Sequence, residues 1–514
     1  MLSDGRELAI LDVREELIFS ESHLLHARSA PLSRFELKIT ALVPRPATRI
    51  VLCDAGDGLA DRAAEILATS GYADISTLDG GISGWAAAGF ELFSGVNVPS
   101  KAFGEFVELQ CHTPGIDAAD LDRLLREKAD IVVVDSRPFD EYQRVSIPTA
   151  TSMPGAELVM RVRDLAPSPE TTVVVNCAGR TRSIIGAQSL INAGLPNKVM
   201  ALRNGTMGWS LAGYLCESGK EKRAPAPSPE SLDWAQKAAS RVASRHGVRQ
   251  IDLATLERLR SETSERTLYL VDVRDPAEYV RGHLPGAISA PGGQLVQATD
   301  QYIGTLGSRI VLVDDSGVRA LMTASWLVQM GWKEVYALRA TGSEQRTPPA
   351  RILGRYEWPD ARIEPHALSK MLDTGDATVV DFSLSRAYRA GHIPGAWYAI
   401  RSRMREAFAK IEIAGSMLAL TSEDGTLAGL AVPEVRSLTD RRVAWLDGGN
   451  AAWKVAGYAM QAGEDRLADE PVDVWLKPYE RRVATSAAMA EYLSWEVDLV
   501  SRIERDGSCS FRTQ

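Results

Sequence analysis

The strongest constraint on the fold of this 514-residue chain is a sequence unit that occurs four times. Each copy starts with an apolar run that ends in an aspartate, and a histidine or serine follows eleven residues later. The four pairs are Asp12 with His23, Asp135 with Ser146, Asp272 with His283, and Asp381 with His392. Self-similarity of this kind indicates a tandem architecture in which each repeat is one structural unit.

Two further markers follow each aspartate at a nearly constant distance. A second apolar run ends 40 to 42 residues after the aspartate, at Cys53, Cys177, Asp314 or Thr421. A tryptophan lies 32 residues beyond that position in units one, two and four, at Trp85, Trp209 and Trp453. A mere alternation of strands and helices would not fix these offsets, so we predict four related units.

Within a unit, short apolar runs alternate with segments of helical periodicity. This order predicts an α/β fold in which a mostly parallel central sheet carries helices on both faces, a three-layer α/β/α arrangement. The helical segment after Cys177 ends at Gly194, a predicted C-terminal cap, and Gly71 holds the same place in unit one. Ligands of such sheets bind at the carboxyl ends of the strands, where the loops after Cys53 and Cys177 should lie.

These markers place the four units at residues 1–95, 100–222, 235–350 and 358–475, followed by a tail at 476–514. The first unit lacks the helical lead-in of the others. The charged and proline-rich segment 220–231 predicts a linker, and the tail contains one helical stretch and a polar end.

Composition narrows the classes of partner. A net charge of -9 disfavours nucleic acid, which requires clustered Lys and Arg. Five widely spaced cysteines without a Cys-x-x-Cys pair predict neither a disulfide framework nor a zinc site, and they fit a reducing compartment. Charges interrupt the apolar runs of the N-terminus, and no apolar stretch approaches membrane length. We expect a cytoplasmic protein with no membrane partner, no metal and no organic cofactor.

The most informative segment is the loop after the second apolar run of unit two. The chain turns there through Cys177, Ala178, Gly179, Arg180, Thr181 and Arg182 and is predicted to enter a helix near Ser183. Backbone N–H groups at a helix start lack internal partners and favour negative charge, so a thiolate is favoured at this position. Arg180 and Arg182 add positive charge that could hold an anion.

This loop predicts covalent catalysis with an anionic sulfur donor such as thiosulfate. The thiolate would attack the outer sulfur of the donor, and sulfite would leave while the basic loop screens its charge. A thiophilic acceptor, cyanide or a thiol, would then remove the sulfur in a second half-reaction.

The DVR, GHIPGA and LDGG motifs, together with the loop from Cys177 to Ser183, resemble the rhodanese homology domain over almost the whole chain. The resemblance implies that Cys177 is the persulfide nucleophile. It also implies that the backbone N–H groups of the loop and Arg182 form the sulfur pocket, with Ala178, Gly179, Arg180, Thr181 and Ser183 around the substrate. The four-unit arrangement is similar to that of bacterial tetra-rhodanese proteins.

The other units depart from this pattern. The loop of unit one keeps Cys53 and Gly56 but has no arginine, and Asp54 and Asp57 would repel a thiolate. Cys53 is therefore either a second sulfur carrier or part of a vestigial site. Asp314 replaces the cysteine in unit three although Arg319 is kept, and Thr421 replaces it in unit four. We expect units three and four to be structural or to close over the site of unit two.

Several single residues have a structural interpretation. We expect His283 and His392 to stabilise turns, Asp135 and Arg137 to form a bracing pair, and the three tryptophans to lie in the core. The remaining cysteines, Cys111, Cys216 and Cys509, have no supporting loop.

Two other functions compete with sulfur transfer. Phosphatases and arsenate reductases of related fold use, by resemblance, a wider loop of five residues between cysteine and arginine, whereas four residues separate Cys177 from Arg182. A non-catalytic or relay scaffold that passes sulfur to a partner protein is the main alternative, because two or three units lack a complete loop. The two loop arginines favour thiosulfate over 3-mercaptopyruvate as the donor.

Overall fold

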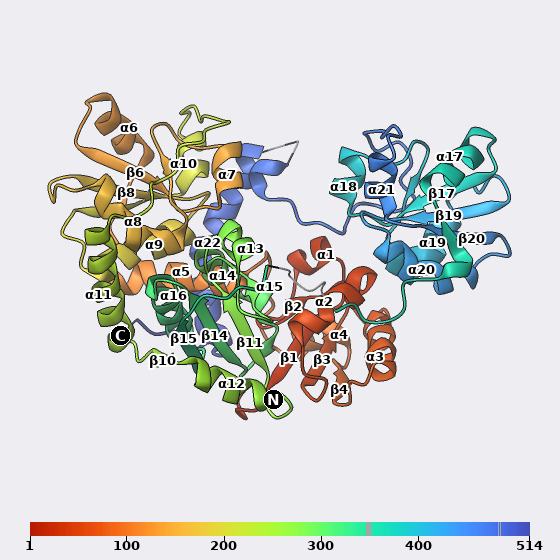
Figure 1. Cartoon of the computed structure of the whole chain (residues 1–514), viewed down its shortest axis with the longest axis horizontal. Helices are drawn as coiled ribbons and strands as arrows, with labels where there is room; N and C mark the ends of the chain where they lie inside the picture. Colours follow the sequence, from red (N-terminus) through yellow and green to blue (C-terminus); the bar gives the residue numbers. More distant parts are fainter. Residues whose placement is uncertain (346–350, 482, 484, 514) are drawn as a thin grey trace.

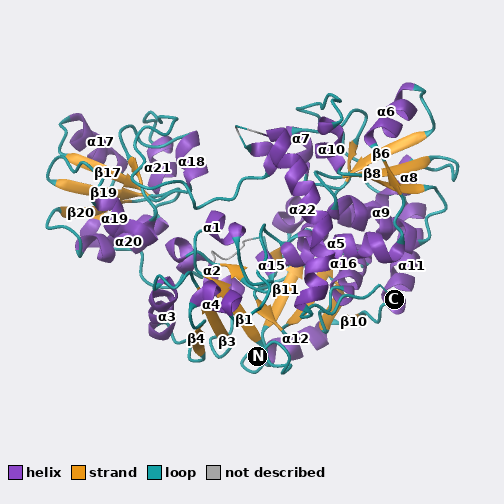
Figure 2. Cartoon of the chain, turned by 180° about the vertical axis from the view of Figure 1, so that it is seen from behind, coloured by secondary structure: helices purple, strands orange, loops and turns teal. Residues whose placement is uncertain are grey.

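A computed structural model describes residues 1–345, 351–481, 483 and 485–513. Its four units lie side by side in the order two, three, one, four (Figure 1). Figure 2 shows from behind that each unit has strands at its centre and helices around them. The chain returns after unit four and ends against unit two and unit three (Figure 1). None of the described helices is long and apolar enough to span a membrane.

The first two units follow the predicted order of elements. Unit one contains β1 (Leu8–Asp12), α1 (Glu16–Glu21), β2 (Arg28–Ser29), η1 (Leu32–Arg34), α2 (Phe35–Leu42), β3 (Arg49–Cys53), α3 (Leu59–Thr69), β4 (Ile75–Thr77) and α4 (Gly81–Ala87). Unit two contains α5 (Val98–Cys111), β5 (Gly115–Ile116), α6 (Ala118–Arg126), β6 (Ile131–Asp135), α7 (Phe139–Arg144), β7 (Thr151–Ser152), η2 (Gly155–Glu157), α8 (Leu158–Leu165), β8 (Thr172–Asn176), α9 (Thr181–Ala193), β9 (Val199–Leu202) and α10 (Gly205–Leu211).

The last two units repeat this order, and the tail adds one long helix. Unit three contains α11 (Pro229–Arg245), β10 (Arg249–Ile251), α12 (Leu253–Ser261), β11 (Leu268–Asp272), α13 (Pro276–Arg281), β12 (Ile288–Ser289), α14 (Gly292–Gln297), α15 (Thr299–Tyr302), β13 (Thr305–Leu306), β14 (Arg309–Asp314), α16 (Val318–Gln329) and β15 (Glu334–Arg339). Unit four contains η3 (Pro359–Ala361), β16 (Arg362–Ile363), α17 (Pro365–Asp373), β17 (Ala377–Asp381), α18 (Ser385–Ala390), β18 (Trp397–Tyr398), η4 (Arg401–Arg403), α19 (Met404–Phe408), β19 (Met417–Thr421), α20 (Thr426–Arg436), β20 (Arg442–Leu446) and α21 (Gly449–Val455). The tail contains η5 (Pro478–Glu480) and α22 (Thr485–Asp506).

The predicted parallel sheets are confirmed. Units two, three and four each have five parallel strands, in the orders β5-β9-β8-β6-β7, β10-β15-β14-β11-β12 and β16-β20-β19-β17-β18. Unit one has no described strand in the place of β5; its sheet gains β13 of unit three, which pairs antiparallel with β1.

Both faces of each sheet are buried, which explains the continuous apolar runs. In unit two, Val133 and Val174 pack with α6, α7 and α10, whereas Val134, Val173 and Val175 pack with α8 and α9. The three-layer prediction is therefore confirmed. The core between this sheet and the helices α8 and α9 continues without a break into unit three, where it includes α11 and α16.

The units associate in two matching pairs. The same position of the repeat forms both contacts: η2 of unit two meets α14 of unit three, and η1 of unit one meets η4 of unit four. Ion pairs bridge each contact, Arg319 with Glu157 at 2.5 Å and Arg401 with Glu36 at 2.8 Å. The strand pairing of β13 with β1 then joins the two pairs.

The structural predictions for the repeat markers agree with the contacts. Arg137 Nη2 donates to Asp135 Oδ2 at 2.7 Å and to the Val145 carbonyl at 2.6 Å. His283 and His392 are buried, and each stacks on the tyrosine four residues before it. Trp209 and Trp453 are core residues, whereas Trp85 is half-buried.

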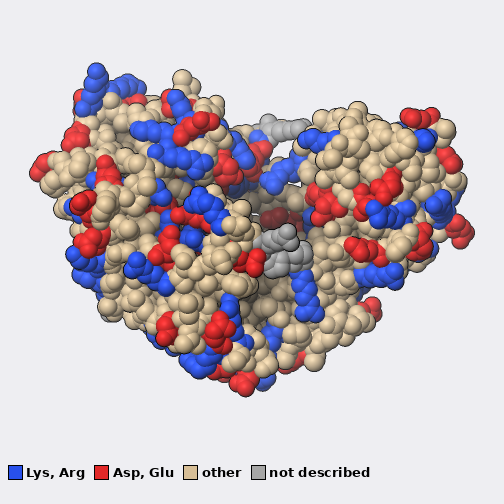
Figure 3. Space-filling view, in the orientation of Figure 1, with Lys and Arg blue, Asp and Glu red and all other residues tan. Residues whose placement is uncertain are grey.

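The predicted linker at 220–231 is wrong at its end, because α11 begins at Pro229 with Ser228 as its N-cap. Earlier in the segment, the Ala224 amide donates to the Ser152 carbonyl, so this part runs along unit two. The predicted end of unit three at residue 350 lies outside the described residues. Lys, Arg, Asp and Glu side chains are intermixed over the face seen in Figure 3.

We predict that Glu15 makes the contact of units one and four sensitive to pH. Burial raises the pKa of Glu15 to about 7, although Ser33 and Ser402 donate to its carboxylate. Since this pKa exceeds the ordinary 4.5, the folded protein holds the proton longer than the unfolded chain. The associated stability, about 3 kcal/mol, is therefore fully present below about pH 4.5 and is lost as pH rises from there through about 7.

Thermal unfolding of the full chain between pH 5 and 8 checks this prediction. Glu15→Gln should flatten the pH dependence of the unfolding midpoint, whereas Glu21→Gln, at the exposed end of the helix α1 that follows Glu15, should leave it unchanged. An equally steep dependence in Glu15→Gln would assign the effect to other groups.

Candidate active site

Cys177 lies at the carboxyl edge of the sheet of unit two, directly after β8 and before α9. Its residue is only 2 % exposed. The thiol donates to Ser183 Oγ at 3.4 Å, and this hydroxyl donates to the Arg180 carbonyl at 2.8 Å. The structure thus brings Cys177 and Ser183, both predicted site residues, into direct contact.

The first residues of α10 fix the backbone of Cys177. The Cys177 carbonyl accepts hydrogen bonds from the Thr206 amide at 2.8 Å and from Thr206 Oγ1 at 3.1 Å. Gly205 has a φ of +52°, and a Cβ on it would lie 2.3 Å from the Cys177 carbonyl oxygen. Glycine is required there both by conformation and by close approach.

The backbone amides around Cys177 have unused hydrogen-bonding capacity. The amides of the five consecutive residues Ala178–Arg182 have no hydrogen-bond acceptor among the described residues. The helix begins at Thr181, slightly earlier than the predicted start near Ser183. Unpaired amides at the start of a helix form a cradle for an anion, here directly beside the sulfur atom.

In the loop of unit one, a carboxylate of the loop itself occupies part of the corresponding cradle. Asp54 follows Cys53 and accepts from the Gly56 amide at 2.8 Å and from the Ala60 amide at 3.0 Å. Cys53 is fully buried, and its pKa is raised, chiefly by this burial and next by the charge of Asp12. The repulsion by Asp54 expected from sequence is a smaller contribution than burial.

Units three and four also pair some of the corresponding amides with their own side chains. Asp314, in the cysteine position, accepts from the amides of Gly317 at 2.8 Å and Arg319 at 3.1 Å. In unit four, Asp424 Oδ1 accepts from the Thr426 amide at 3.0 Å. Among the described loops, only the one that carries Cys177 gives none of these five amides a side-chain acceptor.

The two loop arginines are already paired with carboxylates. Arg180 binds Glu105 through contacts of 2.6 and 2.7 Å and also contacts Glu108. Arg182 binds Glu141, with Nη2 2.9 Å from Oε2. Arg180 is therefore matched by two carboxylates, whereas Arg182 shares Glu141 with Lys477 and keeps its Nε–H without a partner among the described residues.

The pKa values of the two carboxylates differ in direction. Burial raises the pKa of Glu105 to about 7, against the opposing effect of Arg180. Burial also acts to raise the pKa of Glu141, but the charges of Arg182 and Lys477 outweigh it and hold this pKa well below its usual range.

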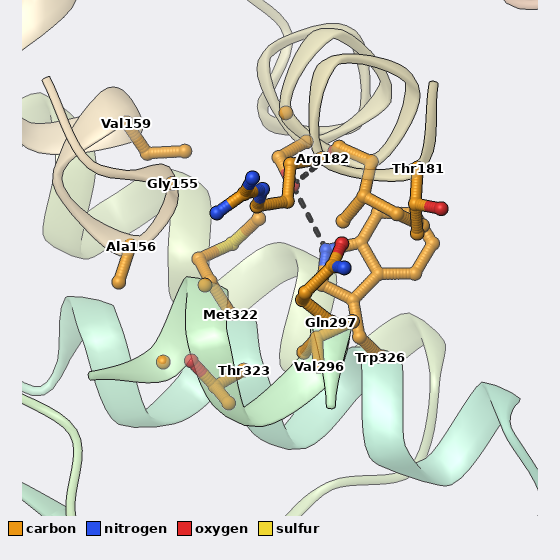
Figure 4. A pocket seen from close by; sticks show the side chains of 15 residues that line it. Gly155, Ala156, Val159, Thr181, Arg182, Val296, Gln297, Met322, Thr323 and Trp326 are labelled. Carbon is orange, nitrogen blue, oxygen red and sulfur yellow. Dashed lines mark hydrogen bonds between the residues drawn. The ribbon is translucent and has the colours of Figure 1, made fainter. Parts of the chain in front are cut away.

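Arg182 also joins the catalytic loop to unit three. Its Nη1 donates to Gln294 Oε1 of α14 at 2.9 Å. Figure 4 shows Arg182 and Thr181 beside a pocket whose opposite wall is formed by Met322, Thr323 and Trp326 of α16. Unit three therefore contacts the loop through Arg182, and Gln297 is its contribution to the lining of the pocket that contains Cys177.

The tail supplies site residues that sequence reasoning missed. We call residues 475–481 together with α22 the C-terminal strap. The strap residues Lys477, Tyr479, Tyr492 and Glu496 line the pocket above Cys177, as does Lys101 of α5. Neither spacing nor motif relates these residues to Cys177 in the sequence, so nothing there could have identified them.

The three remaining cysteines stay outside this arrangement. Cys111, Cys216 and Cys509 are free and half-buried, and none lines the pocket above Cys177. Burial raises the pKa of the Cys509 thiol to about 12, with a smaller contribution from Asp506. A reactive thiol is therefore not expected at the end of the tail.

Comparisons with known proteins agree with the geometry. A family model described as a rhodanese-like domain matches residues 1–88, 117–212, 254–340 and 364–456. The crystal structure of a thiosulfate sulfurtransferase from Pseudomonas aeruginosa is 49 % identical, with 100 % of this chain and 97 % of that chain covered and a TM-score of 0.96.

Shorter similarities also occur. An HTH-type transcriptional regulator from Mycobacterium tuberculosis is 32 % identical over 94 residues, and the match spans 18 % of this chain and 41 % of that curated relative. The SseA 3-mercaptopyruvate sulfotransferase of Escherichia coli is 20 % identical, with 45 % of this chain and all of that chain covered and a TM-score of 0.23.

We predict that Gly205→Ala disables the site more than it destabilises the fold. A Cβ on Gly205 would push against the Cys177 carbonyl, whereas a Cβ on Gly213, which also has a positive φ, meets no atom within 4 Å. Both substitutions carry a similar backbone penalty of about 1 kcal/mol. Sulfur uptake should therefore fall at least ~10-fold in Gly205→Ala only, and equal losses in both variants would contradict the proposed support of the loop.

Proposed function

The chain belongs to the rhodanese-like domain family, and from this premise we propose that it is a sulfurtransferase that uses Cys177 to move sulfane sulfur from an anionic donor such as thiosulfate. The observation that carries the proposal is the row of five unpaired amides, Ala178–Arg182, beside the Cys177 thiol. The full-length similarity to a thiosulfate sulfurtransferase supports the same donor.

In the first half-reaction, the Cys177 thiolate attacks the outer sulfur of thiosulfate. A bond forms between Cys177 Sγ and that sulfur, and the sulfur–sulfur bond of thiosulfate breaks. Sulfite leaves with the electron pair of the broken bond, and Cys177 becomes a persulfide anion. The loop amides stabilise the negative charge on both sides of the step because they are fixed in place beforehand.

In the second half-reaction, a nucleophile such as cyanide attacks the outer persulfide sulfur. The bond between the two sulfurs breaks, thiocyanate leaves, and the electron pair returns to Cys177 as thiolate. Ser183 holds the thiol in its rotamer through the contact at 3.4 Å. Arg180 and Arg182 fix the loop through their carboxylate partners.

We further propose that Cys53 is not a second carrier. A persulfide anion on Cys53 would meet the Asp54 carboxylate in the place where unit two offers bare amides. Units three and four lack a sulfur nucleophile at this position, so their contribution to the reaction is structural.

Mass spectrometry after incubation with thiosulfate tests the nucleophile. The Cys177 peptide should gain the mass of one sulfur atom under non-reducing conditions, and the gain should vanish in Cys177→Ala. The matched variant Cys53→Ala should keep it. Sulfur on the Cys53 peptide would overturn the assignment of unit one as inactive.

The partly occupied cradle of unit one suggests a second test within unit two. Ala178 occupies the place that Asp54 holds in unit one. Ala178→Asp should supply an internal carboxylate to the amides and repel the donor, so that kcat/KM for thiosulfate falls ~100-fold or more.

Ala178→Asn is the matched control, since it has nearly the same shape without the charge. It should lose less than ~10-fold. Equal losses in the two variants would assign the effect to size and would remove the cradle from the mechanism.

A further inference from the structure

The C-terminal strap lies directly on the catalytic loop. A Cβ on Gly179 would lie 3.2 Å from Glu496 Oε2 and 3.7 Å from Leu493 Cδ2, and both of these residues belong to α22. Met489 and Leu493 of α22 are buried against Met207, which belongs to the loop and helix that support Cys177. The strap thus forms one wall of the reaction site although it follows Cys177 by about three hundred residues of chain.

Both ends of the strap are fixed to other parts of the protein. At its start, Lys477 Nζ lies 3.0 Å from Glu141 Oε1, and Arg144 pairs with Glu480 at 3.0 Å. Near the end of α22, Arg502 pairs with Glu91 of unit one at 3.0 Å. These contacts hold the strap to units one and two at the same time.

The space left above the sulfur is small. The pocket that contains Cys177 has a volume of about 70 Å³, and Cys177 is 2 % exposed. A cavity of about 150 Å³ holds benzene, so a compact molecule of a few heavy atoms fits. A cysteine side chain carried by a folded protein brings its backbone and neighbours with it and does not fit beneath α22.

The charged side chains of the pocket wall also affect which molecules the pocket binds. Four basic side chains line or approach it, and each is paired with a carboxylate; the strap itself contributes Lys477 and Glu496. Lys101 Nζ contacts Glu496 Oε1 at 3.1 Å, and the Tyr492 hydroxyl donates to the same oxygen at 3.1 Å. Arg182 and Lys477 share the carboxylate of Glu141, and the Nε–H of Arg182 has no partner among the described residues, so attraction for an anion comes from the loop amides and from Arg182.

We infer that the C-terminal strap restricts Cys177 to small donors and small acceptor nucleophiles, and that it excludes a thiol presented by a folded partner protein. This inference rests on the proposed sulfur transfer through Cys177. It selects between the acceptor classes that the sequence leaves open, because a relay to a partner protein requires α22 to leave the loop.

The test uses the full-length protein loaded with sulfur from thiosulfate, which first establishes whether the proposed function holds. The loaded protein is then mixed with cyanide or with reduced thioredoxin, and loss of sulfur from the Cys177 peptide is followed in time. Transfer to cyanide should be at least ~100-fold faster than transfer to the protein thiol. Comparable rates for the two acceptors would overturn the inference while leaving the proposed function intact.

A variant pair shows whether the strap causes the selection. Leu493→Ala loosens α22 from Met207, whereas Val497→Ala changes a residue of the same helix that is 53 % exposed. The ratio of the protein rate to the cyanide rate should rise at least ~10-fold in Leu493→Ala only. An unchanged ratio in a folded Leu493→Ala protein would remove the strap from acceptor selection.

Alkylation of the wild-type protein gives the same information without a substitution. Iodoacetamide should modify Cys177, as read from peptide masses, whereas the bulky and rigid iodoacetamidofluorescein should modify it at least ~10-fold more slowly. Equal rates would show that the strap leaves Cys177 open to large molecules.

Discussion

A helix that starts directly after a buried strand leaves backbone amides that need an acceptor, and this requirement governs all four units. Unit one meets part of it with Asp54, unit three with Asp314 and unit four with Asp424. Unit two leaves the amides of Ala178–Arg182 unpaired beside Cys177. An unmet hydrogen-bonding capacity that would destabilise an ordinary fold is, in unit two, the feature on which the proposed sulfur site depends.

The remaining architecture keeps this loop in place. From below, Gly205 and Thr206 hold the Cys177 carbonyl. From the side, Arg182 joins the loop to α14 of unit three, and the core of the two units is continuous. From above, the strap closes over Gly179. The other three units therefore also affect the site. Unit three contacts the loop, and unit one binds α22 through an ion pair. Unit four precedes the strap in the chain (Figure 1).

The order of strands and helices and the Cys177 loop could be predicted from the sequence, because they depend on residues that are close together in the chain. Strand and helix order follows from local periodicity, and residues such as Asp135 and Arg137 are two positions apart, so their pairing needs no knowledge of the fold. The loop of Cys177 is continuous in sequence, which made its cysteine, glycine and arginines visible together. The partners of those arginines were not visible, because Glu105 and Glu141 lie far from them in the chain and on helices with no special motif.

The sequence by itself determined the four repeats, their parallel sheets and the single complete loop at Cys177, because these features depend on neighbours in the chain. Only the tertiary structure decided that the loop arginines are paired with carboxylates, that the units form two matching pairs, and that Lys477 and Glu496 line the pocket. The physical reason is the range of the interactions: hydrogen bonds of turns and helix starts are local, whereas ion pairs and packed surfaces between units join residues whose separation along the chain carries no pattern.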